Sequence, residues 1–116
     1  MPRLAFEGMA RAILPSGYQI SLVVCGDKLA RKMNIKYRNK NYYPNVLSFP
    51  IDKLDGEIFL NVRKAEREAK LFNVTLNQRL ALLFVHGCFH LKGLDHSDKM
   101  EREEQKVLKK FGLAHN

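Results

Sequence analysis

Three of the chain's four histidines lie within the short stretch HGCFHLKGLDH, at positions 86, 90 and 96. In a helix, His86 and His90 would lie one turn apart, about 6 Å along the axis and about 40° around it, so both imidazoles can reach a common point. Gly93 can adopt a positive φ and turn the chain back, which would return His96 to that point. Because imidazole suits Zn²⁺ and other transition metals, this spacing predicts one divalent metal ion, with zinc the expected ion.

The number of protein ligands indicates what such a metal would do. Structural zinc usually has four protein ligands, whereas catalytic zinc often has three and leaves one position for water. Cys88 would lie about 200° around the helix from His86 and point away, so we expect a core residue there and also at Cys25. The site is therefore predicted to be open. Three unrelated histidines, each satisfied by hydrogen bonds, are the alternative, and the fourth histidine, His115, is given no role.

The residue after the first histidine bears on the reaction. The spacing H-x-x-x-H-x-x-G-x-x-H is that of the metzincin proteases, which place a glutamate general base directly after the first histidine. Gly87 stands there in this chain, which disfavours peptide hydrolysis unless a base comes from elsewhere. We expect the missing side chain to leave space beside the metal for a phosphodiester. Asp95 has two equal interpretations, as a partner of a ligand histidine or as the cap of a helix that starts near Ser97.

Positive charge is concentrated in the first half of the chain. The formal net charge is +8, and residues 1–50 carry eight Lys and Arg against two acidic residues. Six of these cations lie between Lys28 and Lys40, where no acidic residue occurs. Such an excess favours a polyanionic partner, above all nucleic acid. A solvated face that only keeps the protein soluble is the other interpretation.

Length and composition bound the class of protein. A chain of 116 residues with 46% hydrophobic and 28% charged residues is typical of one globular domain, here residues 1–116. The two cysteines make no disulfide framework, and no apolar run reaches the roughly 18 residues that a membrane span needs. The sequence therefore predicts a cytoplasmic protein with no membrane anchor.

Periodicity and turn residues predict the elements that position the histidines. Thr75 and Gln78 form a capping box before the apolar stretch LALLFVHGCFHL, which predicts a buried central helix that ends at Gly93. The other expected elements are helices over 3–13, 28–38, 62–73 and 97–111, strands over 18–25, 43–50 and 57–61, and a loop over 51–56. This order predicts an α+β fold, with helices packed on a small mixed sheet.

The helix over 28–38 is expected to have two faces. Asp27 would cap it, and Leu29, Met33 and Tyr37 would line its core side. The opposite side would show four cations to solvent, namely Lys28, Arg31, Lys32 and Lys36. In the C-terminal helix, the residues available for packing are Met100, Val107, Leu108 and Phe111.

Several segments of the chain together carry a family resemblance. In order, they are MNIKYRNKNYYPNVLSFP (33–50), GEI (56–58), KAEREAK in the next helix, HGCFHLKGLDH (86–96), and a last helix with Met100 and Gln105. These segments resemble the YbeY family, bacterial endoribonucleases and rRNA maturation factors. NVLSFP and the histidine motif together are highly specific. The resemblance implies an α+β fold, a metal held by His86, His90 and His96, and cleavage of single-stranded RNA. It also implies 16S rRNA 3′-end processing and quality control on the small ribosomal subunit, without a small-molecule cofactor.

Carried over by position, the resemblance implies that Arg38 is the basic residue of the active cleft and that Ser48 lies in the cleft strand. The chemistry of Arg38 agrees, because a guanidinium can hold a phosphate with two hydrogen bonds and stabilise the charge that grows in the transition state. A surface arginine at a helix end is the alternative. Tyr42 and Tyr43 can stack on unpaired bases, whereas Tyr37 is expected on the core side of its helix.

The chain departs from the family pattern at the lip of the cleft. Asn41 and Tyr43–Pro44 stand where an acidic residue and a Pro-Thr pair are usual, and Leu94 replaces a usual tyrosine. Two other functions are compatible with the sequence. One is a metallopeptidase that uses the same histidines, and the other is a non-catalytic ribosome-associated factor with a structural metal. Gly87 and the charge of +8 count against the first, and the open ligand position counts against the second.

Overall fold

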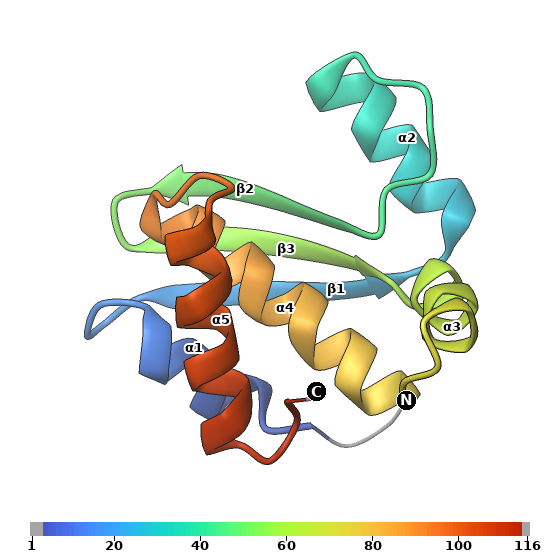
Figure 1. Ribbon diagram of the computed structural model, residues 1–116. Coiled ribbons are helices and arrows are strands. Elements are labelled where there is room, and N and C mark those ends of the chain that lie inside the picture. Colours follow the sequence, from blue (N-terminus) through green and yellow to red (C-terminus); the bar gives the residue numbers. More distant parts are fainter. Residues whose placement is uncertain (1–3, 115–116) are drawn as a thin grey trace.

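A computed structural model describes residues 4–114 of the protein. Its elements follow the predicted order: α1 (Phe6–Ile13), β1 (Gln19–Cys25), α2 (Asp27–Arg38), β2 (Val46–Asp52), β3 (Asp55–Asn61), α3 (Val62–Leu71), α4 (Leu76–Lys92) and α5 (Asp98–Lys110). The strands form a mixed sheet in the order β1-β3-β2, with β1 parallel and β2 antiparallel to β3. The predicted α+β fold is therefore confirmed (Figure 1). Every helix within residues 4–114 is too short or too polar to cross a bilayer.

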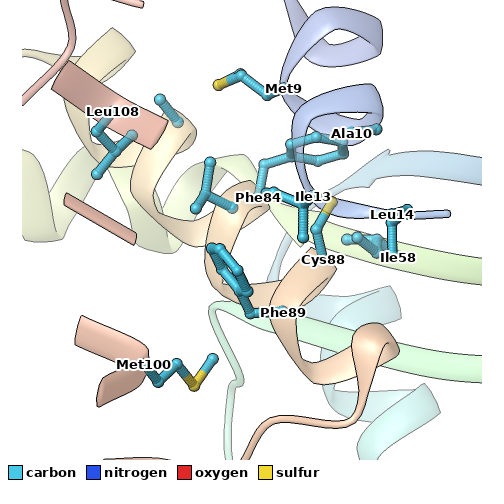
Figure 2. Close-up of a cluster of buried hydrophobic side chains, with 12 residues drawn as sticks. Met9, Ala10, Ile13, Leu14, Ile58, Phe84, Cys88, Phe89, Met100 and Leu108 are labelled. Carbon is cyan, nitrogen blue, oxygen red and sulfur yellow. The ribbon is translucent and has the colours of Figure 1, made fainter. Parts of the chain in front are cut away.

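The central helix α4 runs across one face of the sheet, with α1 and α5 beside it (Figure 1). Its predicted capping box is present, since Thr75 accepts from the Gln78 backbone N–H and Gln78 accepts in return. It ends at Gly93, whose φ of 103° is one that glycine adopts without strain. Its buried residues are Leu80, Ala81, Leu83, Phe84, Val85, Gly87, Cys88 and Phe89. In Figure 2, side chains of α4 meet those of α1, α5 and β3 in one hydrophobic core.

Helices α1 and α5 largely match their predictions. α1 begins at Phe6, whereas its predicted start, residue 3, lies outside the described residues. His115 also lies outside them. In α5, Met100 and Leu108 are almost completely buried, and Val107 and Phe111 pack against the same core. The two helices thus close the core around α4.

β2 and β3 form a tight hairpin where the sequence predicted a loop over 51–56. β2 begins at Val46, three residues later than expected, and continues to Asp52, so only Lys53 and Leu54 join it to β3. Pro50 cannot donate a ladder hydrogen bond, but β2 is an edge strand, where proline is tolerated. The register shifts between Pro50 and Asp52. The predicted loop therefore consists of the last residues of β2, a two-residue turn and the first residues of β3.

The packed face of α2 overlaps only in part with the predicted one. Ala30 and Asn34 are its buried residues, whereas the side chains of Leu29 and Tyr37 are 38% and 56% exposed. The small Ala30 permits close approach to the sheet, and Asn34 donates to the carbonyl oxygen of Tyr42 at 3.2 Å. On the predicted side, Met33 is half-buried and the Tyr37 ring meets an aromatic ring of β2 edge-on at 5.5 Å. The prediction of a core side is therefore correct in part, and the residue it omitted is the polar anchor Asn34.

Asp27 is not the N-cap of α2, as the sequence predicted. Gly26 occupies the cap position, and the Asp27 carboxylate accepts hydrogen bonds from Arg67 at 2.8 and 2.9 Å and from Asn61 at 2.9 Å. These donors lower the pKa of Asp27 to about 2. The residue therefore ties α2 to α3 and to the end of β3.

Candidate active site

The three histidines come together at the end of α4. His86 and His90 lie one turn apart on the helix, and the turn at Gly93 returns His96 to them. One ring nitrogen from each histidine lies within 4.8 Å of the others. Because zinc binds imidazole nitrogen at about 2.0–2.1 Å, small ring movements would let all three share one ion.

Hydrogen bonds set the direction in which two of the rings face. The carbonyl oxygen of Leu94 can only accept, so Nδ1 of His90, 3.1 Å away, donates to it. Nδ1 of His86 likewise donates to the carboxylate of Glu104 at 2.6 Å. Both Nε2 atoms are then left with lone pairs that face each other at 2.9 Å. Two such acceptors repel each other unless a cation lies near both, so these residues fit a metal.

Protonation of His90 is disfavoured, so a proton shared between the two Nε2 atoms would not replace the metal. Burial lowers the pKa of His90, and the nearby rings of His86 and His96 lower it further. The neutral imidazole is the form that binds a metal, and second hydrogen bonds of the kind made by Glu104 fix its tautomer and orientation. The cluster is therefore prepared to accept a divalent ion.

Glu104 was missed by the sequence analysis. It comes from α5 and is only 5% exposed. A usable signal was present, because Met100, Glu104 and Leu108 follow one another at helical spacing and all three are buried. A carboxylate within an apolar stripe indicates a buried partner, here His86.

Asp95 takes neither of its two expected places. It is exposed, and the cap of α5 is Ser97, whose side chain accepts from the Met100 backbone N–H at 3.1 Å. The partners of His86 and His90 are instead Glu104 and the Leu94 carbonyl. The residue next to a ligand in sequence is thus not the one that supports it.

Gly87 faces the sheet, so the expectation that it leaves space beside the metal is wrong. A Cβ atom at this position would lie 2.8 Å from Oγ of Ser48 and 3.1 Å from Cδ1 of Ile58. The Ser48 hydroxyl donates to the Gly87 carbonyl oxygen at 3.0 Å. Glycine is therefore required for α4 to pack closely on β2 and β3, which in turn places the neighbouring histidine.

Cys88 is a core residue, as its position on the helix predicted. Its side chain is fully buried in the cluster of Figure 2, and burial raises the pKa of the thiol to about 12. Cys25 is half-buried on β1, and its pKa is also raised by burial. Within residues 4–114, the group that could hold a metal consists of the three histidines alone.

A cavity of about 520 Å³ opens in front of the histidines. It is lined by Arg38, Tyr42, Pro44, Asn45, Val46, Ser48, Lys64, His86, His90 and His96. The structure thus brings Arg38, from the end of α2, and Ser48, from β2, to the same cavity as the histidines. Lys64 of α3 was missed, because its place depends on how α3 packs beside the loop after α2. The described lining contains two cations and no carboxylate.

A family model described as Endoribonuclease YbeY matches residues 4–112. The chain belongs to the YbeY endoribonuclease family. Endoribonuclease YbeY of Heliobacterium modesticaldum is 34% identical over 96% of this chain and 84% of that protein. Endoribonuclease YbeY of Methylobacillus flagellatus is 36% identical over 93% of this chain and 74% of that protein.

A solved structure shows the same fold. The solution structure of a protein from Thermotoga maritima matches with a TM-score of 0.68 over 90% of this chain and 75% of that chain, at 24% identity. The predicted membership of the YbeY family is confirmed, and with it the prediction that the chain is a nuclease enzyme.

Proposed function

We propose that the chain is a metal-dependent endoribonuclease for single-stranded RNA, in which His86, His90 and His96 hold the metal and Arg38 binds the scissile phosphate. The observation that carries the proposal is the cavity of about 520 Å³, which joins these histidines to the side chains of Arg38 and Lys64. A phosphodiester carries negative charge that grows as it reacts, and this lining offers cations without an opposing carboxylate.

Each described residue has a distinct part in this scheme. A bound zinc would supply a Lewis acid that polarises a phosphoryl oxygen. Glu104 holds the His86 ring through Nδ1, and the Leu94 carbonyl holds His90 in the same way. Arg38 presents a planar pair of N–H donors that match two phosphate oxygens, and Lys64 adds a point charge. Binding and orientation therefore come from α2 and α3, and the metal ligands come from α4 and the turn after it.

An exposed tyrosine in the cavity lining favours an unpaired RNA strand as the substrate. Tyr42 lines it and is 47% exposed, so its ring is free to stack on a base. A base within a duplex is already stacked and paired on both sides, whereas an unpaired base can rotate onto an aromatic ring. Single-stranded RNA is therefore the substrate that uses both the cations and the tyrosine.

The finer role that we propose is 16S rRNA 3′-end processing and quality control of the small ribosomal subunit in the cytoplasm. The match of NVLSFP and of the histidine motif to the YbeY family supports this role, as does the net charge of +8. The peptidase alternative finds no support, because Gly87 provides no base and the described cavity lining contains no carboxylate. A purely structural metal would give no reason for a cationic cavity beside it.

A comparison of substrates tests the proposal. Zinc-loaded protein is incubated separately with single-stranded RNA, the same RNA as a duplex, a 16S rRNA precursor and an unfolded protein. We expect cleavage of the single strand and of unpaired 3′ nucleotides of the precursor, loss of cleavage on chelation, and recovery when metal is restored. A His86→Ala preparation controls for contaminating nuclease. Cleavage of the unfolded protein alone would favour the peptidase, and no cleavage at all would favour the non-catalytic factor.

A further inference from the structure

A second cationic hollow lies along α2, outside the active site. Its volume is about 520 Å³, and its lining consists of Asp27, Lys28, Arg31, Lys32, Ile35, Lys36 and Tyr43. It shares no lining residue with the cavity in front of the histidines. Figure 1 shows α2 at one edge of the molecule, apart from α1, α4 and α5, so that its outer side faces solvent.

The charge of this hollow is not compensated by its surroundings. Within residues 4–114, no ion pair involves Lys28, Lys32 or Lys36, whereas arginines of α3 and α4 pair with nearby carboxylates. The one acidic lining residue, Asp27, already accepts two hydrogen bonds from Arg67. The hollow therefore presents a net positive field, which favours an anionic partner.

The loop between α2 and β2 connects the hollow to the active-site cavity. Tyr42 lines the active-site cavity and Tyr43 lines the hollow, and both rings are nearly half exposed. A cation lies beside each ring, since Nζ of Lys64 is 6.0 Å from the Tyr42 ring centre and Cζ of Arg31 is 5.9 Å from that of Tyr43. Two consecutive residues of this loop thus place one aromatic ring at each cationic surface.

Hydrogen bonds from side chains of α2, β3 and α3 hold this loop in place. Nε of Arg31 donates to Asn41 at 2.7 Å, and the Asn34 side chain donates to the Tyr42 carbonyl oxygen at 3.2 Å. The Asn61 side chain donates to the Pro44 carbonyl oxygen at 3.0 Å. Nζ of Lys64 also donates to the Tyr43 carbonyl oxygen. Because the loop is anchored at four points, the rings need little ordering when a ligand binds, which raises affinity.

We propose that the α2 hollow is a second binding site for the same RNA strand, where nucleotides that flank the cleaved bond lie after crossing Tyr42 and Tyr43. The proposal rests on the proposed ribonuclease function. Lysines that track a phosphate backbone together with rings that stack on bases are the usual means of binding single strands without sequence preference. An acidic protein would use the cations but would have no need of two rings beside them.

This site determines binding rather than chemistry. Flanking contacts made equally in the ground state and the transition state lower KM and leave kcat unchanged. Each phosphate neutralised on a single strand also adds about 0.7 to the slope of log affinity against log salt. A short substrate that fills only the active-site cavity gains nothing from the hollow.

The test compares two triple variants. In the first, Lys28, Lys32 and Lys36 are each changed to Gln, while Arg31 is kept because it anchors the loop. The control changes Lys70, Lys109 and Lys110 to Gln, three exposed lysines of α3 and α5 with the same total charge. Fluorescence anisotropy and single-turnover cleavage are measured with single-stranded RNAs of about 4 and about 16 nucleotides, a span of known site sizes.

We expect the α2 triple variant to bind and cleave the long RNA with Kd and KM raised at least tenfold, a reduced salt slope and an unchanged rate at saturation. The short RNA and the control variant should behave as wild type. An unchanged affinity for the long RNA, an equal loss for the short RNA, or an equal loss in the control would each overturn the proposal. If wild type binds the long RNA without cutting it and the α2 variant alone loses binding, the second site stands and the ribonuclease function fails.

Discussion

α4 and α2 both contribute to the candidate site, but they are held in opposite ways. α4 buries eight of its residues and places the histidines by packing on the sheet and on α5. α2 buries only Ala30 and Asn34 and presents Arg38 at its exposed end. The helix with the proposed metal ligands is thus part of the core, whereas the helix with the proposed phosphate-binding residue lies at the edge of the molecule.

Metal binding and RNA binding impose different constraints on the helices that serve them. Metal ligands must converge to within a fraction of an ångström, so they benefit from a buried helix and from fixed partners such as Glu104. Residues that meet a flexible, solvated strand can be exposed, because the strand can adjust its position to them. Changes at the exposed residues of α2 should therefore alter activity without affecting the fold, and changes near the histidines of α4 should alter the metal.

Arg38→Ala gives the largest separation of activity from stability. Loss of a donor aimed at the reacting phosphate typically costs about 10²–10³ in rate. A surface arginine contributes less than about 0.5 kcal/mol to stability, so the melting temperature and metal content should be unchanged. Arg38→Lys should restore little, because lysine keeps the charge and loses the two-pronged geometry. Single-turnover cleavage, melting and metal content are measured on one preparation.

If Arg38→Ala cleaves RNA at the wild-type rate, Arg38 is not part of the active site. The conclusion that α2 contributes to activity separately from α4 would then fail. A variant that loses metal together with activity would show that α2 also supports the histidines, which its exposure argues against.

Glu104→Ala tests the support of the ligands on the α4 side, with a smaller effect. Without the carboxylate, the His86 ring loses the partner that orients its Nε2. Loss of such a partner typically lowers metal affinity about 10–100-fold. Glu104→Gln should retain most of the affinity, because the amide oxygen can still accept from Nδ1. Zinc affinity is measured by competition with a chelator, which does not depend on activity.

Glu103→Ala is the matched control on the same helix, since the side-chain hydrogen bond that Glu103 makes within residues 4–114 is the one it accepts from Lys106 at 3.5 Å. Wild-type zinc affinity in Glu104→Ala would show that packing alone orients His86, and the short hydrogen bond would then have no part in metal binding.

The sequence predicted what is local and missed what depends on packing between elements. The capping box at Thr75, the turn at Gly93 and the convergence of the histidines follow from spacing along one helix. The buried face of α2 did not, because its anchor Asn34 bonds a loop eight residues away. Glu104 lies on α5 and His86 on α4, so their contact depends on how the two helices pack. The sequence signal for Glu104 was its position within an apolar stripe of α5.

The surroundings of Gly87 could not be predicted from the sequence either. Its position beside a ligand histidine suggested a role at the metal, but the side of the helix on which it lies faces Ser48 and Ile58. Helical phase relative to the sheet decides this, and a single sequence contains that information only weakly. The family resemblance supplied Arg38, whose approach to the histidines depends on the whole fold.

Metal content in two variants of α4 decides whether the histidines hold a catalytic metal, since His90 and Cys88 lie two residues apart on one helix and, of the two, His90 lines the cavity. Wild type, His90→Ala and Cys88→Ala are purified in parallel and analysed for bound metal and for cleavage of single-stranded RNA. We expect one metal ion per chain with cleavage in wild type and in Cys88→Ala, and loss of both in His90→Ala. Full metal occupancy and full cleavage in His90→Ala would contradict this expectation.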